Sequence, residues 1–543
     1  QLYSGQLSQA DALALALATV PGDVQLIGAD GQVISMEQLE AMDPAQMQQG
    51  VIAAIRIKQT SPLYVQASGQ LRASAAGAGF IHATDGLDVA DLQTGGALRL
   101  TVDGDLATVG SPGAAAIRSG ADMVLTVAGD IGSDLQGSSP QAVELAVGGV
   151  LTGNAGGAAA LRQHGGDLQF NSLYVGQGLQ VEVVDGSLLS TNADGVTLVA
   201  GQTDLVARDD IGALAGGLLN VRLSAGELLN AGAGRDVRIG SIDSDLHIGQ
   251  LRSGGDMQLA SAAALQARDL QSDGDLAVRA ASAIGIDHAS ALGSVQLDGQ
   301  DSVAAAQLVA GADLVINSAG NQHLGRAQAG GRAQLHASNG SVVLGSNGLL
   351  QANVVDINAS GLDMQAGAQI LAAQQLDVQL SGDARIGHAH VTGVAGNGAM
   401  NLAATGAIAS NGDGAVDLVA GQGVAVNLDA GNGIGGSDAA LTVDSGRIDA
   451  RATDGDIHLH LLQSAHAGQI SADGGSILLA ADQALSLGQV QARDQIQLTG
   501  TDIVGGVLDS GQDTRVHSAG QLRLDTVNAG GDVALYSEGA LAL

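Results

Sequence analysis

The fold is decided by residues 254–280, which read GGDMQLASAAALQARDLQSDGDLAVRA. This stretch contains two apolar pairs, Met257/Leu259 and Leu276/Val278, and an Asp directly precedes each pair. Apolar residues at alternate positions lie on one face of a β-strand. The stretch therefore predicts two short strands that occupy the same place in successive copies of a repeat.

The same spacing continues along the chain. The next pairs are Val295/Leu297, Leu314/Ile316 and Ala333/Leu335, and the phase returns near the end in Thr514/Val516 and Val533/Leu535. A unit of about 19 residues cannot close a sandwich or a barrel, but it can form one coil of a β-helix whose neighbours cover its apolar interior. We therefore predict an all-β fold, a parallel β-helix (β-solenoid) of roughly two dozen coils, with these pairs as a ladder in its core.

The composition agrees with thin stacked layers. Among 543 residues there are 2 Phe, 4 Tyr and no Trp, although 45% are hydrophobic, so the core must consist of small aliphatic side chains. With 82 Gly and only 5 Pro, the chain has many tight turns but not the composition typical of disorder. The Gly-Gly-Asp runs at 254–256 and 530–532 and the Gly-Asp at 274–275 predict corners whose glycines adopt left-handed backbone angles.

The charge excludes several kinds of partner. The formal net charge is −34 and Lys58 is the only lysine, so the chain has no basic patch for the phosphates of DNA or RNA or for an anionic membrane surface. No apolar run reaches the length of a membrane-spanning helix, which argues against membrane insertion. Residues 1–5 do not resemble the start of a signal peptide, so we expect the sequence to begin after a removed leader or inside a larger chain.

The first residues differ from the repeat, and we assign 1–65 to an N-terminal irregular or cap region and 66–543 to the β-helix rod. Ser35 with Gln38 forms a capping-box pattern, and Asp43-Pro44 is a second helix start. These signals predict short helices over 36–49, either as a cap on the rod or as an excursion from it.

The Gly/Ala-rich coils resemble a known family. Segments such as SGGDMQLASAAALQARDLQ (253–271) and AGGDVALYSEGALAL (529–543) look like filamentous haemagglutinin-type exoproteins, the large substrates of bacterial two-partner secretion. The resemblance covers roughly 64–543. It implies a right-handed β-helix that is exported through an outer-membrane barrel transporter and folds outside the cell. The Asn-Pro-Asn motifs of the family's secretion domain are missing from this sequence.

Few residue patterns suggest chemistry. The acidic pairs Asp209/Asp210 and Asp454/Asp456 are candidates for sugar cleavage, but 55 acidic residues make such pairs expected by chance, and the shortage of aromatics argues against a catalytic groove. We therefore expect no enzyme activity and no cofactor. Asp residues at corners are either calcium ligands or ordinary turn residues, and the latter interpretation is favoured.

Two His-x-His pairs are metal-site candidates, His388/His390 and His458/His460, because residues i and i+2 of a strand share a face. The competing interpretation is two outward polar positions on a coil, which is favoured because no third ligand is identifiable. Among the aromatics, Phe170 and Tyr174 are candidates for a binding surface, although Leu168-Gln-Phe170 also has the spacing of core residues.

These observations predict a secreted adhesin stalk at the bacterial cell surface. Its partners would be host cells, neighbouring cells or matrix polysaccharide. The alternatives are the stalk of a contact-dependent growth inhibition protein, with a toxin beyond residue 543, and a polysaccharide-processing β-helix enzyme.

Overall fold

The computed structural model describes the backbone of three strands near the N-terminus and, in full, residues 62–66, 69–110, 113–135, 141–192, 194–393 and 398–543. The three strands are β1 (Asp23–Gly28), β2 (Val33–Ile34) and β3 (Ile52–Lys58), and they form an antiparallel sheet in the order β2-β1-β3. The helices predicted over 36–49 lie outside the described residues.

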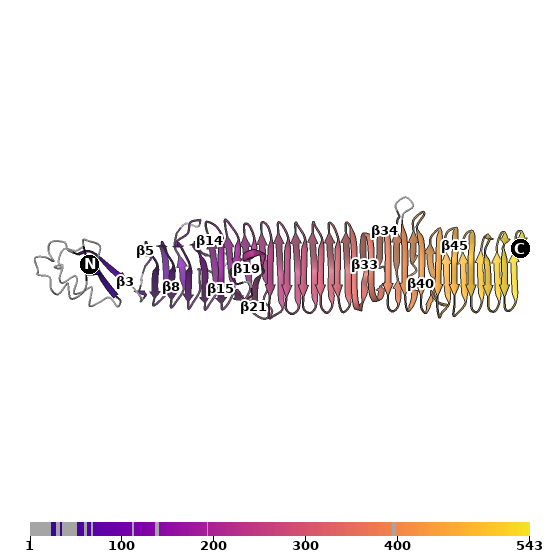
Figure 1. The fold of residues 1–543 in the computed structure, drawn as a ribbon, viewed down its shortest axis with the longest axis horizontal. Coiled ribbons are helices and arrows are strands. Elements are labelled where there is room, and N and C mark those ends of the chain that lie inside the picture. Colours follow the sequence, from indigo (N-terminus) through magenta and orange to yellow (C-terminus); the bar gives the residue numbers. More distant parts are fainter. Residues whose placement is uncertain are drawn as a thin grey trace, which may run out of the picture. The chain divides into compact units, whose positions relative to one another are not determined.

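The chain divides into two units, residues 1–161 and residues 162–543. Each contains stacked coils of short parallel strands, about 23 coils in all, and the predicted β-solenoid is therefore confirmed (Figure 1). In the described residues the only helix is a single 3-10 turn, Leu214–Gly216. Inward positions hold mainly Leu, Val, Ile and Ala, with some Ser, Thr and Met, and the largest fully buried side chain is Phe170.

In unit 1 the first coils have 18 or 19 residues, close to the predicted repeat, whereas the later coils are longer. Leu98 of β8 pairs with Met123 of β11, and Met123 pairs in turn with Leu151 of β13. The strands of this unit are β4 (Leu63–Val65), β5 (Leu71–Ala75), β6 (Gly79–Ala83), β7 (Leu87–Thr94), β8 (Leu98–Val102), β9 (Leu106–Thr108), β10 (Ile117–Ser119), β11 (Met123–Val127), β12 (Val143–Val147) and β13 (Val150–Ala155), with β14 (Ala159–Gln163) at the boundary.

In unit 2 the predicted ladder is found, and it consists of two adjacent columns of inward side chains. Both columns are continuous through the strand register, and each of their ten members is buried, with at most 1% exposed, as predicted. The first column is Met257, Leu276, Val295, Leu314 and Ala333, and the second is Leu259, Val278, Leu297, Ile316 and Leu335.

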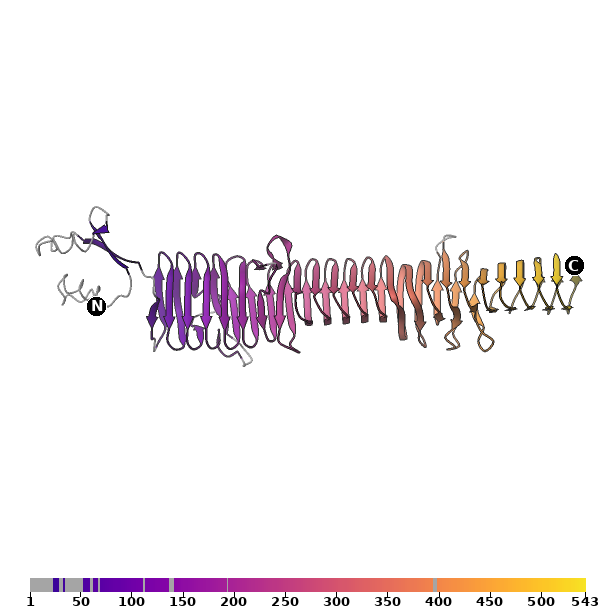
Figure 2. The same cartoon turned by 60° about the horizontal axis from the view of Figure 1, so that its bottom comes forward.

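The coils that carry this ladder extend from about residue 246 to residue 337. From β24 to β32 these coils alternate an eight-residue strand with a five-residue strand, and they follow one another as a regular row in Figure 2. The ladder lies on the five-residue strands and on the start of the longer β33, and polar or small residues alternate there with the buried ones.

The strands of the first half of unit 2 are β15 (Leu168–Val175), β16 (Leu179–Val183), β17 (Leu188–Ser190), β18 (Leu198–Ala200), β19 (Thr203–Ala207), β20 (Ile211–Ala213), β21 (Leu219–Leu223), β22 (Leu229–Ala233), β23 (Val237–Ser241), β24 (Leu246–Ser253), β25 (Met257–Ser261), β26 (Leu265–Ser272), β27 (Leu276–Ala280), β28 (Ile284–Ala291), β29 (Val295–Gly299), β30 (Val303–Ala310), β31 (Leu314–Ser318), β32 (Gln322–Ala329) and β33 (Arg332–Met364).

The strands of the second half are β34 (Gln369–Leu380), β35 (Ala384–Ile386), β36 (His388–Val391), β37 (Ala399–Ala404), β38 (Ala407–Ser410), β39 (Leu418–Ala420), β40 (Ala425–Ala430), β41 (Gly433–Ile434), β42 (Leu441–Asp444), β43 (Arg447–Ala452), β44 (Ile457–Leu461), β45 (Ala465–Ala472), β46 (Ile477–Ala481), β47 (Leu485–Ala492), β48 (Ile496–Gly500), β49 (Ile503–Val504), β50 (Val507–Ser510), β51 (Thr514–Ser518), β52 (Leu522–Arg523), β53 (Thr526–Ala529), β54 (Val533–Ser537) and β55 (Leu541–Ala542).

At two places in unit 2, a column of short strands continues as a column of long strands in the next coil. The short strand β22 stacks on the long strand β24, and later the short strand β43 stacks on the long strand β45, each time with a shift in register. Conversely, the separate strands β41 and β42 both stack on the single strand β44. Coil length can therefore vary while the inward side chains continue to stack from coil to coil.

The glycines before the corner aspartates have a different role from the one predicted. None of the glycines at 254, 255, 274, 530 and 531 has a left-handed backbone, so that prediction is wrong. Instead, a Cβ on Gly274 would collide with Oδ1 of Asp256 in the preceding coil. A Cβ on Gly531 would likewise collide with Oδ1 of Asp513. Glycine is required at these corners by close approach between coils.

The corner aspartates explain that close approach. Oδ1 of Asp256 accepts a hydrogen bond from the backbone N–H of Asp275 in the next coil, at 2.9 Å. Oδ1 of Asp275 in turn accepts one from the N–H of Ser294, at 2.7 Å. The same bond recurs at other corners, with the acceptors Asp105, Asp122, Asp210, Asp236, Asp313, Asp456, Asp502 and Asp513. Each of these carboxylates satisfies a corner N–H that has no strand partner.

Candidate functional site

Three surface depressions of unit 2 lie on one side of the solenoid. The first lies across β25 to β33 and the second around β33 and β34, and both include Asn317 and His336. The third lies across β37 to β47 and begins at Asn401, which pairs with Asp377 of the second. We call their shared outward surface the polar face, and its polar side chains include Arg279, Asp298, Asn317, His336, Asp356, Asn358, Asp377, Gln379, Asn401, Asn427, Asp429, Asp449, Arg451, Gln469, Ser471, Asp473 and Gln491.

The polar face arises from strand alternation and stacking. In β40, for example, Val426 and Leu428 are buried while Asn427 and Asp429 point outward. Parallel pairing then places outward residues of successive coils in columns. One column runs through Asp377, Asn401, Asn427 and Asp449, and its neighbour runs through Gln379, Ala403, Asp429, Arg451, Ser471 and Gln491.

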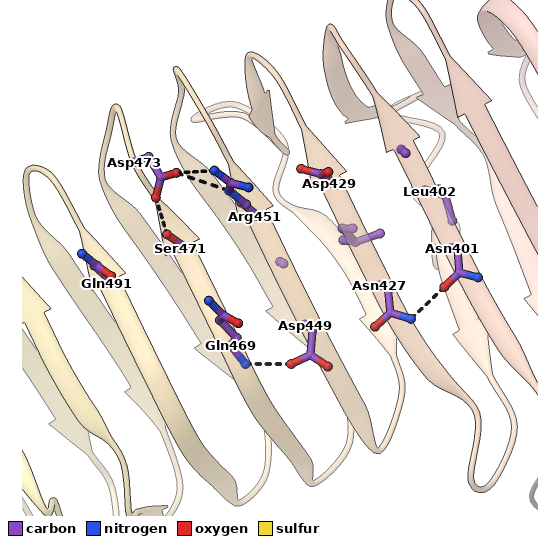
Figure 3. A pocket seen from close by; sticks show the side chains of 13 residues that line it. Asn401, Leu402, Asn427, Asp429, Asp449, Arg451, Gln469, Ser471, Asp473 and Gln491 are labelled. Atoms are coloured by element: carbon purple, nitrogen blue, oxygen red, sulfur yellow. Dashed lines mark hydrogen bonds and ion pairs between the residues drawn. The ribbon is translucent and has the colours of Figure 1, made fainter.

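The third depression has a volume of about 480 Å³ and is shown in Figure 3. On one side, Asn427 Nδ2 donates to Asn401 Oδ1 at 2.7 Å, and Asn401 Nδ2 donates to Asp377 Oδ1 at 2.6 Å. On the other side, Arg451 Nη2 lies 2.9 Å from Asp473 Oδ2. The depression is therefore held in shape by side-chain hydrogen bonds between coils.

The ion pair between Arg451 and Asp473 in this depression shifts the pKa of both residues. Hydrogen bonds from the Ser471 hydroxyl and then from Arg451 lower the pKa of Asp473, and the bond to Asp473 with the charge of Asp429 raises the pKa of Arg451. Asp473 is therefore ionised at neutral pH. A glycosidase general acid needs the opposite, a carboxyl group whose pKa is raised.

Other polar groups in the depression have no partner in the described part of the protein. The backbone N–H of Gln469 donates to Asp449 Oδ1 at 2.7 Å, whereas the side-chain amide of Gln469 makes no hydrogen bond to the described residues. The exposed side chain of Gln491 likewise makes none within the described ranges. These amides are placed to donate and accept hydrogen bonds with a ligand.

A second polar cluster lies at residues 410–417. Asp417 is only 1% exposed, and its carboxylate accepts hydrogen bonds from Ser410 Oγ at 2.7 Å and from the Thr442 N–H at 2.8 Å. Burial raises the pKa of Asp417 despite these bonds. Asp413, by contrast, is exposed, and the N–H groups of Ala415 and Gly367 lower its pKa. The buried acid lines none of the three depressions and supports the turn.

The predicted histidine pairs lie on the surface at alternate positions of β36 and β44. The His388 and His390 rings are 6.3 Å apart, and His388 Nδ1 contacts the Val416 carbonyl oxygen at 2.8 Å. His460 Nε2 lies 2.8 Å from Asp482 Oδ1, while Nδ1 of His458 is buried without a partner among the described residues. In the described part of the chain, no three His, Asp or Glu side chains are grouped closely enough to hold a metal ion.

The remaining candidates fall at separate places. Phe170 is fully buried and thus part of the core, so of the aromatic pair only Tyr174, which is half exposed, lies at the surface. Of the acidic pairs, Asp210 and Asp456 are corner acceptors of backbone N–H groups. The polar face itself was missed. Arg279, Asp298, Asn317 and His336 repeat every 19 residues, but the sequence analysis considered only the apolar members of that repeat. The members of the third depression stand at irregular intervals and become neighbours only through the strand register.

Comparison of the chain with protein-family models, with curated proteins and with solved structures gave no match in any of the three. The resemblance to filamentous haemagglutinin-type exoproteins therefore remains a prediction from the sequence. Among the residues described, none belongs to a helix with the length and hydrophobicity needed to cross a lipid bilayer.

Proposed function

We propose that this chain is the stiff, non-catalytic stalk of an exported bacterial adhesin, which attaches a cell to another cell, to a host surface or to matrix polysaccharide. The observation that supports the proposal most strongly is the uninterrupted stacking of coils within each unit, with a buried aliphatic ladder and no globular insertion between coils in the described residues. Stacked repeats of this kind contact only their neighbours and extend in one dimension.

The stacking also supplies a mechanical role. In the regular coils of unit 2, all of β25 pairs with all of β27, and the longer strands β24 and β26 pair in parallel beside them. To separate two coils, all of these backbone hydrogen bonds and the aliphatic contacts between the coils must be broken nearly together. Such a stack resists bending without disulfides, which agrees with the absence of cysteine from the sequence.

Export through an outer-membrane barrel transporter belongs to the same proposal, and the protein would then act at the cell surface. Its support is the sequence resemblance together with the absence of cysteine, since a chain without thiols cannot be trapped by disulfides while it crosses an oxidising compartment.

The proposal is tested by the shape of the purified chain. Small-angle scattering and negative-stain electron microscopy are expected to show a particle several times longer than it is wide, with a β-dominated circular dichroism spectrum. A compact globular particle would contradict the stalk. Cells that display the chain are further expected to attach to a partner surface more than cells that do not, and equal attachment would remove the adhesin role.

A further inference from the structure

The polar face contains a long, shallow strip that neither the core nor the corners require. Its three depressions have volumes of about 610, 380 and 480 Å³ and follow one another along the stacked strands. A strip of this form suits a linear polymer that runs along the stack of coils better than a compact small molecule, which prefers an enclosed apolar pocket.

The chemistry of the strip limits the class of polymer. The polar side chains that line it include six aspartates and two arginines, and both arginines are paired, Arg279 with Asp298 at 3.4 Å and Arg451 with Asp473 at 2.9 Å. No Phe, Tyr or Trp lines the three depressions. The excess of negative charge repels sulfated or uronic-acid polymers, and the absence of aromatic or large apolar anchors does not suit a protein partner.

The hydrogen-bonding groups of the third depression suit hydroxyl groups. Gln469 and Gln491 present uncommitted amides from neighbouring coils, and Asn427 retains a carbonyl oxygen after donating to Asn401. Asp449 of β43 stands between the amides of Asn427 and Gln469, and strands of successive coils are about 4.8 Å apart. This interval is close to the advance of one sugar residue along an extended β-linked glycan.

We propose that the third depression, at Asn401, Asn427, Gln469 and Gln491, is a binding subsite for a linear glycan of uncharged sugars that lies along the stacked coils and is held without cleavage. The proposal rests on the proposed function, whose ligand class and contact surface it specifies. The ion pair with Arg451 keeps the Asp473 carboxylate ionised, so this residue does not act as a general acid.

The test uses the full chain and four hexasaccharide probes, measured by titration calorimetry. Cellohexaose and β-1,4-mannohexaose are uncharged, an alginate hexamer is anionic and a chitosan hexamer is cationic. At least one uncharged probe is expected to bind, and the double variant Gln469→Ala/Gln491→Ala is expected to weaken that binding at least tenfold. Both side chains are exposed and make no hydrogen bonds to the described residues, so folding should be unaffected. Gln307→Ala, an exposed amide on β30 of a different side of the solenoid, is the matched control and should bind like the wild type.

Four results would overturn the proposal. These are no binding of either uncharged probe, equal binding by the double variant, tighter binding of the alginate or chitosan hexamer than of the uncharged ones, and hydrolysis of a bound probe. Self-association of the wild type that the double variant abolishes would instead assign the strip to a second copy of the chain. Small-angle scattering of the same samples distinguishes failure of the binding subsite from failure of the stalk. An elongated particle that binds no glycan would contradict only the binding subsite.

Discussion

At the scale of the residue, the corner of a coil depends on a pair of side chains in successive coils. An aspartate such as Asp256 accepts the backbone N–H of the next corner, and a Cβ on the glycine that lies over its carboxylate, Gly274, would collide with it. Most corners of this kind have a glycine at that place, whereas Arg235 occupies it over Asp210 and Ala263 over Asp245. The Gly-Asp sequence therefore reflects contact between coils and not a local turn preference. A glycine and an aspartate that are adjacent in the sequence serve two different neighbours, the coil before and the coil after.

Replacement of Gly274 by Ala tests this dependence. The added Cβ would meet Asp256 Oδ1 and would also lie 2.9 Å from the backbone carbon of Gly255, so the two coils must separate locally. We expect a loss of about 1–3 kcal/mol in the free energy of unfolding, as for other overpacked sites. The measurement is chemical denaturation followed by circular dichroism.

Gly446→Ala is the control for this substitution. Gly446 is also an exposed turn glycine of unit 2, but a Cβ there would meet no atom within 4 Å and its backbone is not left-handed. It is expected to unfold like the wild type. Equal stability of the Gly274→Ala and Gly446→Ala variants would show that close approach does not determine the choice of glycine.

The buried carboxyl group of Asp417 predicts a pH effect. Because burial raises the pKa of Asp417, the folded state favours its protonated form. The stability that this protonation contributes is fully present below about pH 4 and is lost as the pH rises through the folded-state pKa. Asp417→Asn should therefore be more stable than the wild type at neutral pH, and the difference should shrink on acidification. Hydrogen exchange of β39 and β42 over this range of pH measures it. Asp413, whose pKa is shifted in the opposite direction, is present in both proteins, and its negative charge adds to the raised pKa of Asp417. A difference that does not vary with pH would contradict the assignment.

At the scale of the element, each strand is stabilised mainly by the two strands on which it stacks. Leu259 of β25 is fully buried between Ile239 of β23 and Val278 of β27, while the adjacent Gln258 points to solvent. Leu259→Ala should cost about 2–5 kcal/mol of local stability, whereas Gln258→Ala should cost almost nothing.

The spatial extent of that loss is the more informative result. In a stack of repeats, energetic coupling falls off with each interface between neighbours. Amide exchange in Leu259→Ala should therefore accelerate in β23, β25 and β27 and return to the wild-type rate several coils away. Uniform acceleration over the whole of unit 2 would show that the coils unfold as one cooperative body.

The element scale also shows what the sequence can predict. Alternation in pairs such as Met257/Leu259 predicts strands and their inward face correctly, because burial of small aliphatic residues leaves little freedom. The longer coils in the later part of unit 1 are not predictable from the repeat of unit 2, since additional residues in an exposed turn do not disturb the ladder. The third depression was hidden for the same reason, because irregular turns change the sequence separation of its stacked residues. The sheet of β1, β2 and β3 carries no repeat signal at all.

At the scale of the whole molecule, the dominant electrostatic term is the net charge of −34. Exposed ion pairs such as Arg208 with Asp185 contribute at most about 1 kcal/mol each, and salt screens them as it screens the repulsion. Because aspartates far outnumber arginines, relief of repulsion should prevail. We expect the thermal midpoint to rise by a few degrees between about 10 and 150 mM NaCl.

A calcium salt at the same ionic strength completes this measurement. An equal rise of the thermal midpoint in the two salts would mean screening alone. A clearly larger rise of the midpoint in CaCl₂ would mean that corner aspartates also bind the cation. A midpoint that falls as NaCl is added would show instead that the ion pairs outweigh the repulsion.

The bonds from corner N–H groups to aspartate carboxylates share one direction at almost every corner: the acceptor belongs to the earlier coil and the donor to the later one. The exception is Asp525, which accepts from Gly506 of the earlier coil. A finished coil thus already exposes the carboxylate that the following stretch of chain needs. A polypeptide that is released progressively, N-terminal end first, can therefore fold coil by coil, since each step needs only contacts with the coil that precedes it.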